Sequence, residues 1–285
     1  MSLKEIKNRI ASVSNTRKTT SAMKMVSSVK LRKAQQSIQT ALPYVRQLDH
    51  ILSSLSAMPQ AGLLSPLLVS REVKRTAVVC FSSDSSLCGA FNGNIIRHSR
   101  SLIAKLSESG ESPLVYTVGE RITDAFRKEG LEADTGYSGM MEKRAYGQAV
   151  SLADELMDMY LNGVIDKVVL SYTHFRSAGS QQIVDTVLLP VSVETAGSQY
   201  ANDYILEPSA ERLIETLLPK VIRMKLYSAV LDSYASEQAA RVVAMQAATE
   251  NADKLIGELT LQYNKLRQQA ITSELLDLAG GSQNN

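Results

Sequence analysis

The residues that could do chemistry are few and lie apart in this 285-residue sequence. One stretch, SSDSSLCGAFNGN, follows a short apolar run at residues 75–82, the place where a doubly wound α/β fold binds ligands. Its Gly89 and Gly93 do not form the G-x-G-x-x-G pattern, and no G-x-x-x-x-G-K-[ST] phosphate loop occurs in the sequence. We therefore interpret these two glycines as parts of a turn.

The histidines and cysteines also lack the partners that catalysis or metal binding needs. The three histidines are His50, His98 and His174. None of them has a Ser, a Cys or a carboxylate pair at a motif spacing, and Asp84 with Cys88 has no base. Cys80 and Cys88 flank the end of a predicted strand, so we expect reduced packing residues there. The sequence predicts no catalytic residue, no metal and no cofactor.

Basic residues are concentrated near the N-terminus. The whole chain has 31 Lys and Arg against 29 Asp and Glu, and this net charge of +2 argues against a general nucleic-acid or membrane-surface role. Residues 1–58 contain only Glu5 and Asp49 as acidic residues. Their ten basic residues are Lys4, Lys7, Arg9, Arg17, Lys18, Lys24, Lys30, Arg32, Lys33 and Arg46. Such a run is ordinarily a solvated helix face.

Residues near both ends of the chain repeat with a period of 3.5, the spacing typical of coiled-coil helices. Near the C-terminus, steps of seven give Leu217, Met224, Leu231, Gln238, Met245, Ala252, Leu259 and Leu266, with a companion series from Val221 to Ala270. Near the N-terminus they give Leu3, Ile10, Arg17, Lys24, Leu31, Ile38, Val45 and Leu52, with a companion series from Ile6 to Leu55. This period predicts two helices that wind around each other as an antiparallel coiled coil.

The ends of the two helices can also be predicted. Ser2 and Glu5 have the spacing of a capping box, and Pro59 with Gly62 should end the first helix about 85 Å later. The second helix should be on the order of 100 Å long, too long for a globule whose radius of gyration would be near ~19 Å. We therefore expect a projecting shaft. Pro219 should either kink the second helix or precede its true start.

The middle of the chain predicts a small α/β (Rossmann-like) domain. Strands and helices alternate, which favours a parallel sheet with covered faces, and residues 181–190 should add an antiparallel edge strand. Strands are expected at residues 75–82, 113–118 and 167–175, and helices at 92–106, 120–129 and 142–161. The predicted parts are a helix at 1–58, the α/β domain at 70–205 and a second helix at 206–285.

The location predicted from the sequence is bacterial and cytoplasmic. No apolar run approaches the roughly 20 residues needed to cross a bilayer. The N-terminal stretch contains neither an apolar signal core nor an Arg-rich, acid-free presequence. We therefore expect neither secretion nor import into an organelle.

Three segments resemble the gamma subunit of F-type rotary ATP synthase, the central stalk. They are residues 4–35 (KEIKNRIASVSNTRKTTSAMKMVSSVKLRKAQ), 83–95 (SDSSLCGAFNGNI) and 235–281, which ends in AITSELLDLAGG. The resemblance implies a non-catalytic rotor inside a ring of alpha and beta subunits. It also implies an α/β domain that rests on the c-ring beside the epsilon subunit, peripheral to the cytoplasmic side of the inner membrane. No nucleic acid is expected, and membrane association should occur only through the complex.

The resemblance also suggests where partners bind. The family's corner loop usually has a basic residue and a glycine where this chain has Ser85 and Ser86. The residues that we expect to contact the catalytic subunits are Arg17, Lys18, Met23, Lys24, Arg241, Gln268, Gln269 and Thr272. Arg17 and Lys24 take seam positions that elsewhere hold Leu, Ile or Val. We therefore expect either that their charges meet carboxylates on a partner or that the second helix has moved away from the first at this level.

Two other functions stay open from the residues alone. A different coiled-coil adaptor with an α/β head would not co-purify with a large ATPase hexamer. An α/β enzyme with helical oligomerisation arms would bind a nucleotide or metabolite as an isolated chain.

Overall fold

The computed structural model describes residues 2–56, 65–137, 139–143, 146–192, 207 and 209–281. By its internal contacts the chain divides into a smaller unit, residues 1–28 with 241–285, and a larger unit, residues 29–240. The long helices α1 (Leu3–Ser56) and α6 (Ala210–Gly281) each belong partly to both units. The three-part division predicted from the sequence follows chain order instead of contacts, and it stays a prediction.

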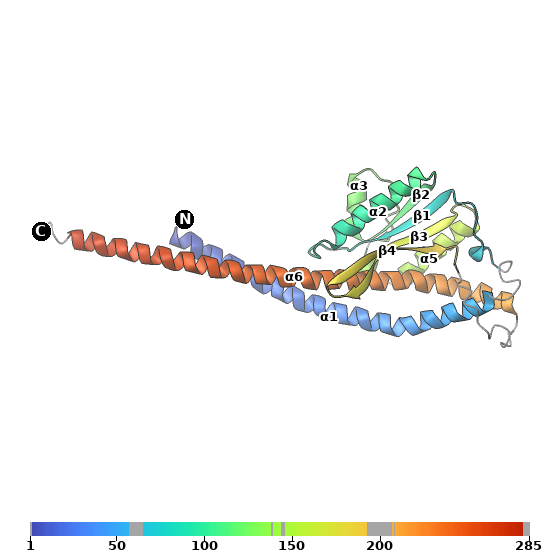
Figure 1. Cartoon of the computed structure of the whole chain (residues 1–285), viewed down its shortest axis with the longest axis horizontal. Helices are drawn as coiled ribbons and strands as arrows, with labels where there is room; N and C mark the ends of the chain where they lie inside the picture. Colours follow the sequence, from blue (N-terminus) through green and yellow to red (C-terminus); the bar gives the residue numbers. More distant parts are fainter. Residues whose placement is uncertain are drawn as a thin grey trace. The chain divides into compact units, whose positions relative to one another are not determined.

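A four-stranded sheet in the order β2-β1-β3-β4 lies in the larger unit (Figure 1). β1 (Arg75–Phe81) pairs in parallel with β2 (Ser112–Val118) and with β3 (Lys167–Ser177). β4 (Ser180–Leu189) returns antiparallel to β3 along the edge. The structure thus confirms the predicted parallel sheet with an antiparallel edge hairpin.

Helices cover both faces of this sheet because β1 is apolar from Ala77 to Phe81. In β1, the consecutive residues Val78 and Val79 point to opposite faces and belong to two different hydrophobic clusters. The Val78 cluster includes residues of α2 (Phe91–Glu108) and α3 (Glu120–Lys128). The Val79 cluster includes residues of α5 (Tyr146–Leu161) and of α6. The larger unit therefore has its hydrophobic core on both sides of β1.

The cysteines are packing residues, as expected. Cys80 and Cys88 are both free and buried. Burial raises the pKa of the Cys80 thiol to about 12, because the charged thiolate would lose its hydration inside the core. Cys80 therefore stays a neutral thiol at ordinary pH.

One predicted helix is divided. Where the sequence predicts a helix at 142–161, the structure has α4 (Met140–Lys143) and α5. Met140 and Met141 are fully buried, so they anchor a separate helical turn in the core. A 3-10 turn, η2 (Pro66–Leu68), precedes β1.

The seam predicted for the long helices is the side on which they are buried. On α1, Ile6 and Ser27 are buried in the smaller unit, and Ala34 and Leu48 are buried in the larger unit. On α6, the buried seam residues of the smaller unit are Met245, Ala252 and Leu259. On each helix these buried residues are separated by seven residues or by a multiple of seven, which confirms the heptad pattern.

The two helices run antiparallel within the smaller unit. The Arg17 Nη1 atom lies 2.9 Å from Asp253 Oδ1, and the Thr20 and Thr249 hydroxyl oxygens lie 2.9 Å apart. As the α1 residue number rises, the α6 number falls. In the larger unit, Lys225 of α6 forms an ion pair with Asp49 of α1 at 3.0 Å. Each unit contains its own stretch of paired helix.

The helix ends agree in part with the prediction. The Ser2 amide donates to Glu5 Oε2 at 2.8 Å and the Glu5 amide donates to Ser2 Oγ at 3.2 Å, which confirms the capping box. The predicted stop at residues 59–62 lies outside the described residues. α6 includes Gly280 and Gly281, and the residues after them lie outside the described residues, so the predicted stop at this pair stays a prediction.

Proline lies inside both long helices. Pro43 is within α1 and Pro219 is within α6. The alternative that the second helix starts after Pro219 is wrong, because α6 begins at Ala210. Ile214 and Leu218 are fully buried, and their packing stabilises the turns before the proline. Each proline still leaves the carbonyl four residues earlier without its helical donor.

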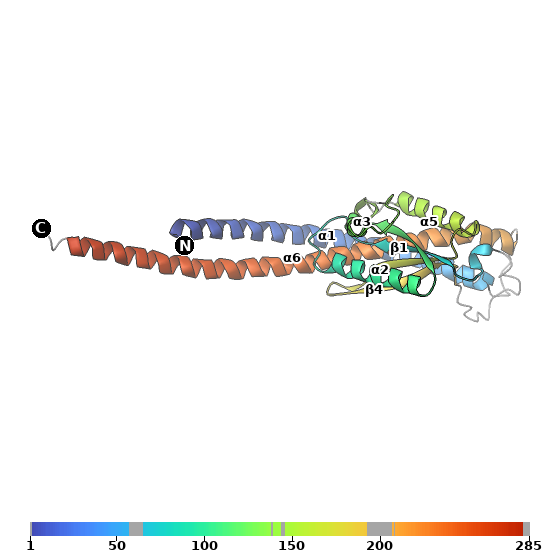
Figure 2. The ribbon, with the colours of Figure 1, turned by 90° about the horizontal axis from the view of Figure 1, so that it is seen from above.

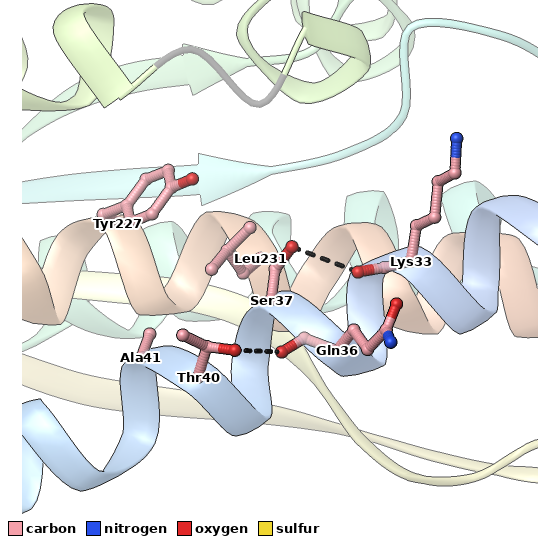
Figure 3. Close-up of a pocket in the computed structure, with 7 residues that line it drawn as sticks. All are labelled: Lys33, Gln36, Ser37, Thr40, Ala41, Tyr227 and Leu231. Atoms are coloured by element: carbon pink, nitrogen blue, oxygen red, sulfur yellow. Dashed lines mark hydrogen bonds between the residues drawn. The ribbon is translucent and has the colours of Figure 1, made fainter.

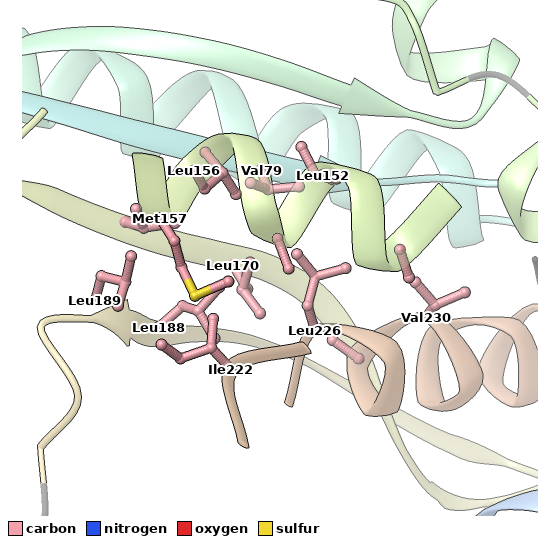
Figure 4. Packing of buried hydrophobic residues seen from close by; sticks show 14 of the residues in the cluster. Val79, Leu152, Leu156, Met157, Leu170, Leu188, Leu189, Ile222, Leu226 and Val230 are labelled. Carbon is pink, nitrogen blue, oxygen red and sulfur yellow. The ribbon is translucent and has the colours of Figure 1, made fainter. Parts of the chain in front are cut away.

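A second apolar face of α6 packs onto the sheet, and the heptad analysis missed it. Ile222, Leu226 and Val230 recur every four residues and are fully buried. Figure 4 shows Ile222 close to Met157 of α5 and Leu188 of β4, and all three residues belong to the hydrophobic cluster that includes Val79. This face attaches α6 to the α/β domain within the larger unit.

Among the described residues, no helix combines the length and the apolar character that crossing a lipid bilayer requires.

Candidate functional site

The turn at the carboxyl end of β1 is held together by its own side chains. The Ser83 amide donates to Asn92 Oδ1 at 3.1 Å, and the Asn92 Nδ2 group donates to Ser83 Oγ at 2.8 Å and contacts Cys88 Sγ at 3.1 Å. Leu87 and Gly89 adopt positive φ angles of 67° and 61°. Asn92 therefore fixes the loop that a nucleotide-binding fold would use for a phosphate.

Neighbouring backbone also closes this corner. Asp84 Oδ1 accepts hydrogen bonds from the amides of Glu120 at 3.2 Å and Gly139 at 3.3 Å. A Cβ atom on Gly119, whose φ is 105°, would lie 2.3 Å from the Ser82 carbonyl oxygen. The ends of β1 and β2 thus approach so closely that only glycine fits.

Two of the three histidines have carboxylate partners that the sequence analysis missed. His98 Nε2 of α2 lies 2.8 Å from Asp185 Oδ2 of β4. His174 Nδ1 of β3 lies 2.5 Å from Asp232 Oδ2 of α6, and Asp232 Oδ1 accepts from the Phe175 amide at 2.8 Å. Their sequence separations of 87 and 58 residues explain why no local motif revealed them. Both pairs join elements of the larger unit.

Clusters suited to a metal ion are not found in the part of the chain that the structure describes. No three His, Cys, Asp or Glu side chains gather there.

Arg17, one of the predicted contact residues, already has a partner within this chain. Its guanidinium pairs with Asp253 on α6, and both side chains are about half exposed. Within the chain, α6 therefore already supplies a carboxylate for this charge, and the contact of Arg17 with a catalytic subunit stays a prediction. The ion pair explains how a charged residue fits a seam position.

Lys18 and Lys24 differ from Arg17. Lys18 is exposed and Lys24 is half-buried, and neither amine forms an ion pair with a described residue. Met23 next to Lys24 is half-buried. These three residues lie within two turns of α1 and leave two positive charges available to a partner.

Arg241 is not a surface residue. Only 7% of it is exposed, beside the buried residues Gln238 and Ala239 in the sequence of α6. In the isolated chain, Arg241 therefore has little surface with which to contact a partner.

The remaining predicted residues lie toward the C-terminal end of α6. Gln268, Gln269 and Thr272 are all exposed, and the Thr272 hydroxyl donates to the Gln268 carbonyl at 2.9 Å. Because Arg17 lies opposite Asp253, Leu3 lies opposite about residue 267. Figures 1 and 2 both show α6 continuing past the start of α1.

This end of α6 also has apolar residues that the sequence analysis did not single out. Ile271, Leu275 and Leu276 are 48%, 60% and 67% exposed. They could have been noticed as apolar residues of α6 that follow the last heptad position opposite α1. Their exposure marks a second candidate contact surface.

The predicted contact residues do not form one site. From Arg241 to Thr272, α6 rises by about 45 Å at ~1.5 Å per residue. Lys18 and Lys24 lie between these levels on the other helix. The predicted contact residues are instead spread along both long helices.

The fold defines a class of proteins in which an α/β domain is inserted between two long, antiparallel terminal helices. The family model described as ATP synthase matches residues 2–284 of this chain. Among its relatives, the ATP synthase gamma chain of Phocaeicola vulgatus is 50% identical over 287 residues, which cover 99% of each chain. That of Bacteroides thetaiotaomicron is 48% identical over 296 residues, again with 99% of each chain covered.

The chain therefore belongs to the ATP synthase gamma chain family. Members of this family form the rotary central stalk and are not themselves catalytic.

Solved structures share the fold at lower sequence identity. A chain in the Euglena gracilis mitochondrial ATP synthase OSCP/F1/c-ring structure aligns with a TM-score of 0.68 at 17% identity, covering 99% of this chain and 93% of that one. A chain in the Tetrahymena thermophila central stalk and c-ring structure aligns with a TM-score of 0.59 at 22% identity, covering 81% and 99%. Both support the arrangement of long helices around a mixed sheet.

Proposed function

We propose that this chain is the turning shaft that couples ion flow through a membrane ring to ATP synthesis or hydrolysis in a catalytic ring. The observation that carries this proposal is the unequal charge of the two helices in the smaller unit. There, α1 contributes six basic residues and one acidic residue, whereas α6 contributes four basic and five acidic residues. The paired helices therefore present different surfaces in different directions.

Such asymmetry gives a physical mechanism. If three equivalent catalytic sites surround the paired helices, each site faces a different side of them. Turning the helices exchanges these surroundings, and each site changes its nucleotide affinity by the difference in contact energy. The rotor thereby couples its angle to sites that it need not touch.

The proposed partners follow from this arrangement and from the family. The smaller unit would contact the alpha and beta subunits, and the α/β domain would rest on the c-ring beside the epsilon subunit. The complex would lie at the bacterial inner membrane, with this chain peripheral on the cytoplasmic side. In this proposal, residues 1–58 and 206–285 form the shaft and residues 70–205 form the domain at its base.

Lys18, Lys24 and Met23 are the proposed contacts on α1, and Gln268, Gln269 and Thr272 are those on α6. The unpaired amines would meet carboxylates of the catalytic subunits. Arg17 would act mainly by holding α1 to α6 through Asp253. Buried Arg241 would act by shaping the paired helices from inside.

The test replaces both unpaired amines. In inverted membrane vesicles with the assembled enzyme, Lys18→Gln/Lys24→Gln should lower the number of protons pumped per ATP hydrolysed, because two charged contacts are lost. Lys18→Arg/Lys24→Arg keeps both charges and should retain normal coupling. Unchanged coupling in the glutamine variant would show that these charges serve solubility alone.

A further inference from the structure

The carboxyl-terminal half of β3 extends beyond its neighbour β1. β1 ends at Phe81, and its last pairing with β3 joins Cys80 to Ser171. β3 itself continues to Ser177, and along this length its other edge pairs with β4. The backbone groups of β3 that point toward β1 after Ser171 therefore need partners other than a strand.

Side chains of α6 supply these partners. The Ser236 hydroxyl donates to the Thr173 carbonyl at 2.9 Å, and the Phe175 amide donates to Asp232 Oδ1 at 2.8 Å. Thr173 and Phe175 are alternate residues of β3, and the two α6 residues lie about one helical turn apart. Two side chains of one helix thus take the place of a neighbouring strand.

The second oxygen of Asp232 adds a contact with the same strand. Asp232 Oδ2 lies 2.5 Å from His174 Nδ1, and the Asp232 side chain is only 16% exposed. Ser236 is fully buried and Thr173 nearly so. We call five residues the β3–α6 junction: Thr173, His174, Phe175, Asp232 and Ser236. Loss of either α6 side chain leaves a backbone group of β3 without its partner, which is costly in a buried place.

These hydrogen bonds restrict α6 in a way that its apolar contacts with the sheet do not. Burial of Ile222, Leu226 and Val230 stays favourable over small displacements, because the hydrophobic effect has no preferred direction. A hydrogen bond weakens steeply once its donor and acceptor lose their alignment. The ion pair of Arg223 with Asp154 on α5 is about one-third exposed and holds α6 less firmly. The junction therefore determines the angle of α6 about its own axis.

On its α1 side, α6 is less closely packed at this level. A groove of about 660 Å³ lies between the two helices beside Leu231, the residue that precedes Asp232 (Figure 3). Polar side chains of α1 line it: Lys33, Gln36, Ser37 and Thr40. α1 therefore restricts the angle of α6 less here than β3 does.

We propose that the β3–α6 junction is a positioning site that makes α6 and the α/β domain turn together. This inference rests on the rotary function proposed above. The smaller unit begins at Arg241, shortly after Ser236, so torque that passes along α6 between the domain and a catalytic ring passes this point. Without the junction, α6 and the domain would turn by different angles under load. ATP would then be hydrolysed without a matching number of ions pumped.

The experiment measures coupling in inverted membrane vesicles that contain the whole assembled enzyme. Asp232→Ala/Ser236→Ala removes both bonds to the strand. Because the loss of two hydrogen bonds raises the population of displaced positions roughly tenfold or more, the protons pumped per ATP hydrolysed should fall at least about twofold against a large opposing gradient. The fall should be smaller when no gradient opposes pumping. Asp232→Asn keeps an oxygen for the Phe175 amide and should retain coupling at every gradient.

Val230→Ala is the matched control. It removes part of a fully buried side chain from the same helix and the same interface, without changing a hydrogen bond. It should lower the thermal unfolding midpoint and leave coupling unchanged. If the double variant does not assemble, Ser236→Ala alone keeps Asp232 in place and should show a smaller fall in coupling.

The comparison of variants separates a positioning role from a merely stabilising one. Equal coupling in the alanine variants and the parent would overturn the proposal. So would an equal fall in Val230→Ala or in Asp232→Asn. A parent enzyme that hydrolyses ATP without pumping protons would contradict the rotary function itself, so the two failures are distinguishable.

Discussion

Arg17 shows how a charged residue can occupy a coiled-coil seam. Its long side chain reaches Asp253 on the opposite helix while the charged groups stay about half exposed. Three residues further along α1, Thr20 shares a hydrogen bond with Thr249, so the seam at this level is polar on both helices. Such polar seam contacts fix the register of two helices more than they add stability.

Exchange of the two charges should test this ion pair. Arg17→Ala should lower the free energy of unfolding by about 0.2–1 kcal/mol, since the pair is half exposed. Arg17→Asp/Asp253→Arg should recover most of that loss, whereas Arg17→Asp alone places two carboxylates together and should lose more. Urea unfolding at low and high salt measures both effects. A charge-exchanged variant no better than Arg17→Asp would show that the pair contributes nothing.

Asp166 has a comparable role in the α/β domain. Its Oδ2 atom accepts from the Lys74 and Arg75 amides, each at 3.0 Å, and its Oδ1 atom lies 3.0 Å from Arg71 Nε. These interactions, the Arg75 amide first, hold the pKa of the Asp166 carboxyl below its usual value, although partial burial opposes them. The charged carboxylate is therefore the form that favours the fold.

The pH dependence of stability follows from the sign of this shift. Because the folded-state pKa is the lower one, the contribution of Asp166 is complete above the unfolded pKa near ~3.9 and is lost as pH falls through the folded value. Asp166→Asn should therefore destabilise the protein at neutral pH, and its difference from the parent should shrink in acid. Urea unfolding between about pH 2 and 7 measures this. A difference that is constant over this range would contradict the assignment.

At the residue scale, sequence reasoning succeeded where the signal was local. The Ser2 and Glu5 capping box needs only a three-residue spacing, and the structure shows both of its hydrogen bonds. Asp253 and the two histidine partners Asp185 and Asp232 were missed. Each of these contacts joins residues far apart in sequence, and only the packing of the elements determines which carboxylate is in reach.

Among the elements, α6 has the most demanding sequence because it packs on two sides in the larger unit. One side carries the heptad residues toward α1, and the other carries Ile222, Leu226 and Val230 toward the sheet. Residues 233–239 are consequently all buried, including the polar side chains of Ser236 and Gln238. A helix buried on two sides has a weak amphipathic pattern, which hid its second face from sequence analysis.

Truncation of Leu226 should test the second face. Leu226→Ala removes a fully buried side chain and should lower the free energy of unfolding by about 2–5 kcal/mol. Leu261→Ala is the matched control on the same helix, because Leu261 is 72% exposed and should change stability by less than about 0.5 kcal/mol. Similar effects of the two substitutions would show that the packing in Figure 4 does not stabilise the protein.

Most elements could be predicted because their patterns are strong. The alternation of strands and helices correctly predicted the parallel sheet. The start of α6 before Pro219 was harder to predict from the sequence. Proline is a local signal for a helix boundary, and here the burial of Ile214 and Leu218 outweighs it.

For the whole molecule, membership of a non-catalytic family leads to a simple expectation. The isolated chain should show no saturable heat with Mg-ATP in calorimetry and no ATP hydrolysis. The reason is that Asn92 and Asp84 occupy the corner where a related fold would hold phosphate. The assembled enzyme, which should hydrolyse ATP in the same buffer, is the positive control. Binding of Mg-ATP at one site with micromolar affinity would contradict this explanation of the corner formed by Asn92 and Asp84.

The C-terminal end of α6 has implications for how cells must produce this subunit. Ile271, Leu275 and Leu276 are largely exposed in the single chain. An orphan copy would present these side chains to chaperones, to proteases and to other orphan copies. Its lifetime before assembly should therefore be short, and its synthesis must be matched in amount and timing to that of the subunits that cover this end.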